Sequence, residues 1–159
     1  MLHKQCEYVL AALTDANRLV MSVALATGLR LGDVLRLETA KLGRAFTIVE
    51  QKTKKKRRVT LPPKLLSELR EHAGEKWVFE NRLSPDRHRT RQAVWKDVKR
   101  AARAFRLPAN AAPHSFRKTY AVELLRRYGD IERVQKALNH SDPAVTMIYA
   151  MADKLMPRG

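Results

Sequence analysis

A histidine and an arginine stand three residues apart in a segment whose spacing suits anion binding. The segment reads PHSFRKTYAVELL and places His114 and Arg117 at the start of a predicted helix. Because residues three apart lie on the same side of a helix, both side chains can reach one anion. The pair alone favours a simpler interpretation, a capping histidine and a solvated arginine, because H-x-x-R arises often by chance.

A second histidine and a tyrosine follow further along the chain. The segment LNHSDPAVTMIYAM places His140 just before a polar turn and Tyr149 near the end of the next predicted helix. A lone tyrosine usually belongs to an amphipathic core or its rim, and we interpret Tyr8, Tyr120 and Tyr128 in that way. Tyr149 becomes a candidate for chemistry only in combination with the motifs that precede it.

Two further basic motifs complete an ordered set. Arg30, in TGLRLGDVLRL, stands at the boundary of two predicted helices, where a side chain is placed accurately yet stays accessible. A lysine follows in EQKTKKKRRVTLP, then come H-S-F-R, N-H and Y. Each motif is weak alone, but the five in this order, with suitable spacing, resemble the tyrosine recombinase (phage integrase) family from about residue 14 to residue 150.

The resemblance implies a role for each matching residue. Arg30 and Arg117 match the two arginines that clamp the phosphate, and His114 matches the first histidine of the family. His140 falls where the family has histidine or tryptophan, and Tyr149 matches the nucleophile. The implied reaction cuts and rejoins DNA strands through a 3′-phosphotyrosyl intermediate.

The family's hairpin lysine falls on Lys52, because the dipeptide KT opens the turn in many relatives. Lys54, Lys55 and Lys56 stand close enough to be alternatives for this position. Asp33, three residues beyond Arg30 on the same helix face, is the candidate to orient the Arg30 guanidinium. The competing interpretation of Asp33 is an ordinary surface ion pair, which contributes little.

The chemistry of such a site needs neither a metal nor a cofactor. Attack on a phosphodiester builds negative charge on the non-bridging oxygens, which two guanidinium groups can bind in bidentate fashion. The phenol, with an ordinary pKa of ~10, must lose its proton, and His114 is our candidate acceptor. Lys52 would protonate the leaving 5′ oxygen, and His140 would donate a hydrogen bond to the phosphate.

The charge of the chain also indicates a polyanionic partner. Lys and Arg number 32 against 16 Asp and Glu, a net charge of +16, and double-stranded DNA is the leading candidate. Basic residues concentrate in the hairpin and along one predicted helix, where we expect phosphate contacts that depend steeply on salt. The expected DNA-contacting residues are Lys54, Lys55, Lys56, Arg57, Lys96, Lys99 and Arg100.

The elements that must position these residues are mostly helical, so we expect an α+β fold with a small antiparallel sheet. Apolar residues at helical spacing predict helices over residues 17–26, from near residue 30, and over residues 64–72, 92–105, 114–128 and 131–138, with a last one after Pro143. Between them, FTIVEQ and RVTL predict a hairpin within residues 45–60, and KWVFE at residues 76–80 a third strand.

Length and composition bound the organisation of the chain. With 159 residues and 45% hydrophobic content, we expect a single catalytic domain over residues 1–159, without the N-terminal core-binding domain that relatives usually carry. One cysteine, Cys6, excludes an internal disulfide, and no apolar run is long enough to span a bilayer. We expect a cytoplasmic, nucleoid-associated protein, monomeric without DNA and tetrameric on paired DNA sites.

Three alternatives compete with this interpretation. A type IB topoisomerase uses a similar residue set but relaxes supercoils without strand exchange, and a regulator of the same fold would bind DNA without cutting it. A metal-dependent transposase or nuclease would need essential carboxylates from scattered residues such as Asp86, Asp97 and Glu123, whose spacing fits no motif.

Overall fold

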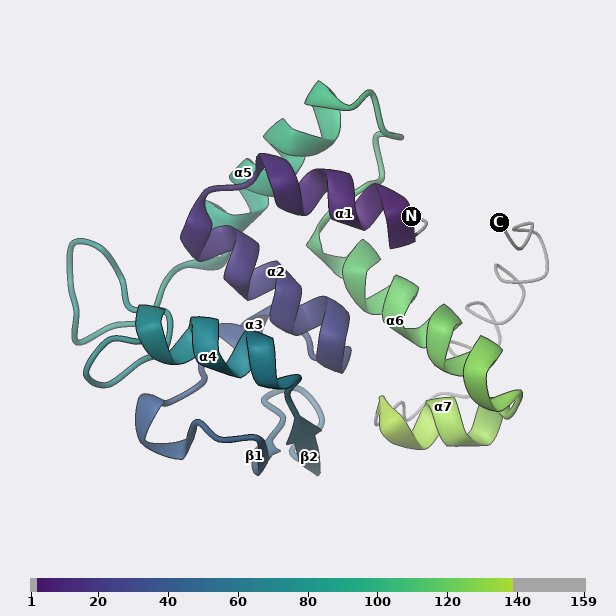
Figure 1. The fold of residues 1–159 in the computed structure, drawn as a ribbon, viewed down its shortest axis with the longest axis horizontal. Helices are drawn as coiled ribbons and strands as arrows, with labels where there is room; N and C mark the ends of the chain where they lie inside the picture. The colour runs from purple at the N-terminus through teal and green to yellow at the C-terminus, as the bar shows by residue number, and fades with distance from the viewer. Residues whose placement is uncertain (1–2, 139–159) are drawn as a thin grey trace.

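Helix α2 (Asp15–Thr27) lies at the centre of the computed structural model, which describes residues 3–138 (Figure 1). Its buried side chains include Leu19, Val20 and Val23, which confirms the apolar stripe predicted for this segment. Among the helices that pack against α2 are α3 (Leu31–Leu35), α4 (Pro63–His72), α5 (Arg91–Ala104) and α6 (Pro113–Tyr128). The residues at the end of α2 are therefore fixed relative to every one of these helices.

An N-terminal helix, α1 (His3–Ala12), precedes the segments for which the sequence predicted helices. It packs against α2 and α5 and buries Cys6 and Val9. Burial of these two side chains against α2 and α5 stabilises α1, since most helical stability in proteins comes from tertiary packing.

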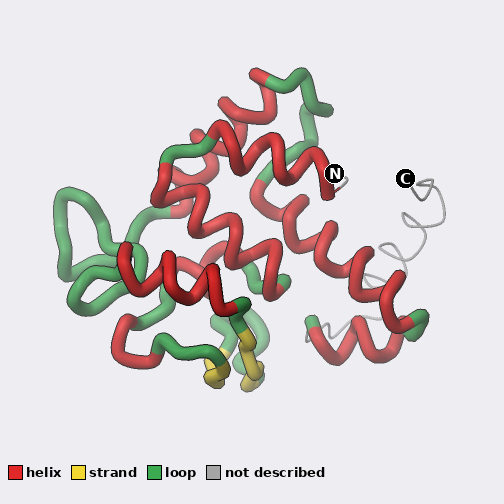
Figure 2. Tube along the Cα trace, viewed as in Figure 1, coloured by secondary structure: helices red, strands yellow, loops and turns green. Residues whose placement is uncertain are grey.

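The two strands of the structure form the predicted hairpin. Strand β1 (Ala45–Val49) pairs antiparallel with β2 (Lys56–Thr60), with Ala45 opposite Thr60 and Val49 opposite Lys56. Within residues 3–138 the sheet has these two strands, drawn in yellow in Figure 2. The hairpin therefore projects a short turn, residues 50–55, from one end of the pair.

The third strand predicted at residues 76–80 is wrong. This segment makes only isolated bridges, Glu38 with Trp77 and Glu80 with His88. Val78 and Phe79 are fully buried in the main core, and the Val78 N–H donates to the carbonyl of Leu37 at 3.0 Å. Burial in an irregular segment, rather than pairing along a strand, explains the apolar run.

Short elements connect α2 to the hairpin. Helix α3 ends at Leu35, so Leu37 lies beyond it and is nevertheless buried. A single 3-10 turn, η1 (Thr39–Lys41), then leads to β1. This short connection brings the start of α3 close to the hairpin.

The C-terminal part of the described chain is a pair of helices. Gly129 ends α6 in a left-handed conformation, and α7 (Ile131–Ala137) turns back against α6, as Figure 1 shows. Val134 and Leu138 form a small apolar cluster with Ala121, separate from the main core. The described fold is thus mostly helical with one small sheet, as predicted. No helix among residues 3–138 is long and apolar enough to cross a membrane.

Candidate active site

Arg30 occupies the turn between α2 and α3. Gly28 ends α2 with φ +70°, and a Cβ at this position would overlap the ring of Tyr120, so only glycine fits. Arg30 follows in an extended conformation as the N-cap residue of α3. Its guanidinium Nη1 donates to Oε2 of Glu50 at 2.7 Å, and 23% of the side chain stays exposed. The side chain is thus held in place yet remains accessible to a ligand.

The turn of the hairpin presents Lys52 to solvent. Two backbone hydrogen bonds close the turn: the Glu50 N–H donates to Lys55 and the Lys54 N–H to Glu50, both at 2.9 Å. Lys54 adopts φ +60°, the left-handed conformation that the tight reversal requires. The backbone around Lys52 is therefore well defined.

Arg30 and Lys52 line one hollow of about 280 Å³, together with Gly32, Asp33, Gln51 and Arg91. Arg91 is the first residue of α5, so three separate elements contribute a cation to the same hollow. Arg91 directly precedes the helix predicted over residues 92–105, and no role was predicted for it. A basic residue at the start of a basic helix was the signal that could have identified it.

Helix α6 supplies His114 and Arg117 from its first turns. Arg117 is 2% exposed, and its Nη2 donates to the carbonyl oxygen of Leu138 at 2.8 Å. His114 lies on the exposed side, and partial burial lowers its pKa, followed in size by the charges of Lys118, Arg117, Arg30 and Lys52. An imidazole surrounded in this way stays neutral near pH 7 and can accept a proton.

The charges that act on His114 include those of Arg30, Lys52 and Arg117. Arg30 and Lys52 thus line one hollow, and His114 and Arg117 lie about one turn apart on α6, so these four predicted site residues come from three parts of the chain that are up to 87 positions apart. His140 and Tyr149, the other two predicted catalytic residues, lie outside the described residues.

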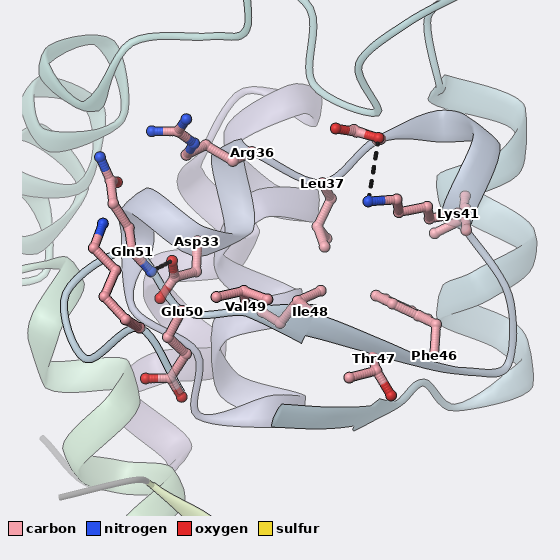
Figure 3. Close-up of a pocket in the computed structure, with 13 residues that line it drawn as sticks. Asp33, Arg36, Leu37, Lys41, Phe46, Thr47, Ile48, Val49, Glu50 and Gln51 are labelled. Carbon is pink, nitrogen blue, oxygen red and sulfur yellow. Dashed lines mark hydrogen bonds and ion pairs between the residues drawn. The ribbon is translucent and has the colours of Figure 1, made fainter. Parts of the chain in front are cut away.

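The role predicted for Asp33 needs a correction. Asp33 is buried, and its Oδ1 accepts the backbone N–H of Gln51 at 3.0 Å, so it holds the hairpin turn (Figure 3). The residue that pairs with the Arg30 guanidinium is Glu50, which is 0% exposed. Glu50 was not among the predicted site residues, although alternation along β1 puts it on the same side as the half-buried Phe46 and Ile48.

A second hollow, of about 330 Å³, adjoins the first and is drawn in Figure 3. It runs beside β1, where Phe46, Ile48 and Val49 form an apolar side, and it reaches Leu37 across from them. Asp33 lines both hollows. Asp33 and Gln51 thus lie between the two hollows.

The basic hairpin residues divide into exposed and buried ones. Lys54, Lys55 and Lys56 are exposed, as the DNA-contacting role requires. Arg57 is 8% exposed, and it donates to the carbonyl of Thr27 inside the protein. In this structure the Arg57 guanidinium therefore contacts the protein interior, and its place in the DNA-contacting set stays a prediction.

The basic residues of α5 also differ from one another. Lys96 is exposed. Lys99 donates to the carbonyl of Ala109 at 2.6 Å, and Arg100 bridges the Asp97 carboxylate and the carbonyl of Ala12, both at 2.6 Å. Lys99 and Arg100 thus already make contacts within the fold, whereas Lys96 has an exposed side chain.

Acidic and metal-binding residues form no alternative site. Within residues 3–138 no group of three or more His, Cys, Asp or Glu side chains is placed to hold a metal ion. Asp97, one of the scattered carboxylates that a metal-dependent nuclease would need, accepts hydrogen bonds from Thr14, Asn17 and Arg100. Its oxygens are thus occupied by the protein itself.

Relatives in sequence agree with the family resemblance. The chain matches the model of the phage integrase family over residues 1–156. It is 32% identical to the tyrosine recombinase XerD of Lacticaseibacillus casei over 90% of this chain, and 30% identical to the tyrosine recombinase XerC of Mesorhizobium japonicum over 86%. The chain spans about half of these relatives, 56% and 47% of their lengths.

Solved structures share the fold. A lambda integrase dimer bound to a COC′ core site superposes with a TM-score of 0.81 at 16% identity, over 100% of this chain and 49% of that one. The XerH recombinase in a post-cleavage complex with its difH substrate gives 0.78 at 23% identity, over 98% and 50%. The motif residues, the helical fold with its basic hairpin and the match over residues 1–156 agree, and this chain belongs to the phage integrase family.

Proposed function

We propose that this chain is the catalytic part of a site-specific DNA recombinase, which cuts and rejoins strands through a 3′-phosphotyrosyl intermediate. The observation that supports the proposal is that Arg30 and Lys52 line one hollow, and that their charges, together with that of Arg117, act on His114 at the start of α6. Named relatives are tyrosine recombinases, and two structural neighbours are recombinases bound to DNA. The substrate that fits this region is a phosphodiester of double-stranded DNA.

In the proposed cleavage step the Tyr149 oxygen attacks a DNA phosphorus. The bond between phosphorus and the Tyr149 oxygen forms, and the bond to the 5′ oxygen breaks. Arg30 and Arg117 bind the non-bridging oxygens, where negative charge develops. His114 accepts the phenol proton, which its lowered pKa allows at neutral pH.

The hairpin supplies the residue that acts on the leaving group. The 5′ oxygen departs as a hydroxyl once Lys52 donates a proton to it, and His140 donates a hydrogen bond to the phosphate. Attack by another 5′ hydroxyl on the phosphotyrosyl bond reverses the step and joins a new strand. Bond energy is conserved, so the reaction consumes no ATP.

Assembly and location follow from the same proposal. Strand exchange needs two DNA sites cut in a coordinated way, so we propose a tetramer on paired sites and a monomer without DNA. A net charge of +16 favours association with DNA in the cytoplasm, at the nucleoid.

A nicked suicide substrate tests the function. The protein is incubated in EDTA with a pool of duplexes randomised around a nick, which lets the short cleaved strand diffuse away and traps the covalent adduct. We expect an adduct on a denaturing gel, its loss in Tyr149→Phe, and its retention in the matched control Tyr8→Phe. The absence of adduct with the wild-type chain across the whole pool, or an adduct that survives in Tyr149→Phe, would contradict the proposal.

A further inference from the structure

Glu50 is a fully buried carboxylate at the base of the hairpin turn. Its Oε2 accepts a hydrogen bond from Arg30 Nη1 at 2.7 Å and from the Thr53 hydroxyl at 3.3 Å. Thr53 follows Lys52 directly in the chain. One carboxylate oxygen is therefore in contact with both the Arg30 side chain and the turn that carries Lys52.

A third contact anchors Glu50 to α2. Its Oε1 lies 3.7 Å from Nη1 of Arg57, and Arg57 donates to the carbonyl of Thr27, the last residue of α2. Burial lowers the pKa of Arg57, and the nearby Glu50 carboxylate opposes that decrease. Glu50 thus joins the end of α2, the start of α3 and the hairpin turn.

We infer that Glu50 is a positioning residue, which holds the Arg30 guanidinium and the Lys52 turn at a fixed separation so that both reach the same phosphate. This inference rests on the proposed function. In the proposed cleavage step Arg30 binds a non-bridging oxygen and Lys52 protonates the leaving oxygen of one phosphate, so their separation must match the size of that group. A displacement of 1 Å in such a site can reduce the rate about 100-fold.

Electrostatics explains why an acidic residue is needed here. Arg30, Lys52, Arg57 and Arg91 are cations around the turn, and without a buried anion they would repel one another. A charged hydrogen bond in a buried site is stronger and more directional than one in water. Glu50 therefore fixes the geometry before DNA binds, whereas Asp33 fixes the backbone of the same turn through Gln51.

The variant Thr53→Val removes the hydrogen bond from the turn to the Glu50 carboxylate, together with the one from the Lys55 N–H to the same hydroxyl, and leaves every charge in place. Thr53→Ser keeps the hydroxyl, and Thr47→Val is a matched control on the exposed face of β1. We expect Thr53→Val to slow single-turnover cleavage of the adduct-forming duplexes about tenfold or more, without change in duplex binding. Thr53→Ser and Thr47→Val should cleave at the wild-type rate.

A sulfur leaving group shows whether the loss acts through Lys52. A 5′-bridging phosphorothiolate releases a thiolate, which needs no proton because the pKa of a thiol is only ~8.5. We expect the tenfold loss in Thr53→Val to shrink to roughly twofold on this duplex. A loss of equal size on the oxygen and sulfur substrates would overturn the link to Lys52.

Glu50→Gln tests the carboxylate itself, with thermal unfolding as a check because it leaves Arg57 buried beside a neutral group. If Glu50→Gln is folded, adding Thr53→Val to it should slow cleavage by less than twofold, because the two act through one contact. If it does not fold, the comparison of Thr53→Val with Thr53→Ser decides. A wild-type chain that forms no adduct counts against the proposed function, whereas wild-type cleavage with full-rate Thr53→Val overturns only the role of Glu50.

Discussion

Asp97 gives a prediction whose size can be worked out from the structure. The carboxylate is 10% exposed and joins α5 to the start of α2. Its Oδ2 accepts from the Thr14 N–H at 3.0 Å, the Thr14 hydroxyl at 3.1 Å and Asn17 Nδ2 at 2.8 Å, while Oδ1 accepts from Arg100. Burial alone raises the pKa of Asp97, but these hydrogen bonds outweigh it and lower the pKa from 3.8 to about 2.

The lowered pKa means that the ionised Asp97 carboxylate stabilises the folded state. A carboxyl that holds its proton less tightly in the folded state stabilises the fold above pH 4, and this stabilisation is lost as pH falls from 4 toward 2. With one pKa unit equal to about 1.36 kcal/mol, the full contribution to the free energy of unfolding is roughly 2 kcal/mol at pH 7. Less than half of it remains at pH 2.5.

Asp97→Asn is the perturbation that measures this contribution. Both carboxylate oxygens face donors, so the amide NH₂ of asparagine must oppose donors in either orientation. We expect Asp97→Asn to be less stable than the wild type by roughly 2 kcal/mol at pH 7, and the difference to narrow to less than half of this at pH 2.5. Urea unfolding at both pH values provides the two free energies.

The pH dependence of the stability difference separates an effect of charge from an effect of side-chain shape. Protonated Asp97 resembles an amide, so the wild type and the variant must converge in acid. Asp86→Asn, at an exposed carboxylate, should have nearly the same stability as the wild type at both pH values. A destabilisation by Asp97→Asn that is as large at pH 2.5 as at pH 7 would show that shape, and not charge, is responsible.

Three further predictions concern single residues. Burial raises the pKa of the Cys6 thiol to about 11, so iodoacetamide at pH 8 should modify it only at the rate of unfolding, as mass spectrometry with and without urea can show. An NMR titration should place the pKa of His114 below 6.5, and Lys118→Gln should raise it, whereas an unchanged value would exclude the lysine as a cause. Gly28→Ala should destabilise the fold by roughly 2 kcal/mol or more, because the left-handed backbone disfavours alanine and its Cβ would overlap Tyr120, and a thermal unfolding midpoint equal to that of the wild type would refute this.

Residue types and their order determined the family and most of the elements. The apolar stripe of α2, the alternation in the hairpin and the H-x-x-R motif at the start of α6 are local patterns, because each depends on residues within one element. The four described catalytic candidates were identified from such patterns. The family resemblance, which implies a shared fold, was enough to predict that these residues lie close together.

Contacts between residues that are far apart in the chain could not be predicted from local patterns. Arg57 was interpreted as a surface cation because it stands in a basic run, yet it lies buried against Thr27, 30 positions away. Asp33 was assigned to Arg30 because the two are three residues apart. The structure pairs Arg30 with Glu50 instead, 20 positions away, and Asp33 with the Gln51 backbone.

The sequence by itself determined which groups are available for chemistry: cations that bind phosphate, two histidines, a tyrosine, and a charge that requires a polyanion. Only the tertiary structure decided which carboxylate holds which cation, and which lysines and arginines face solvent. The physical reason is that burial and pairing depend on how faces of different elements meet, and α2, α3 and the hairpin meet through residues that no local period connects.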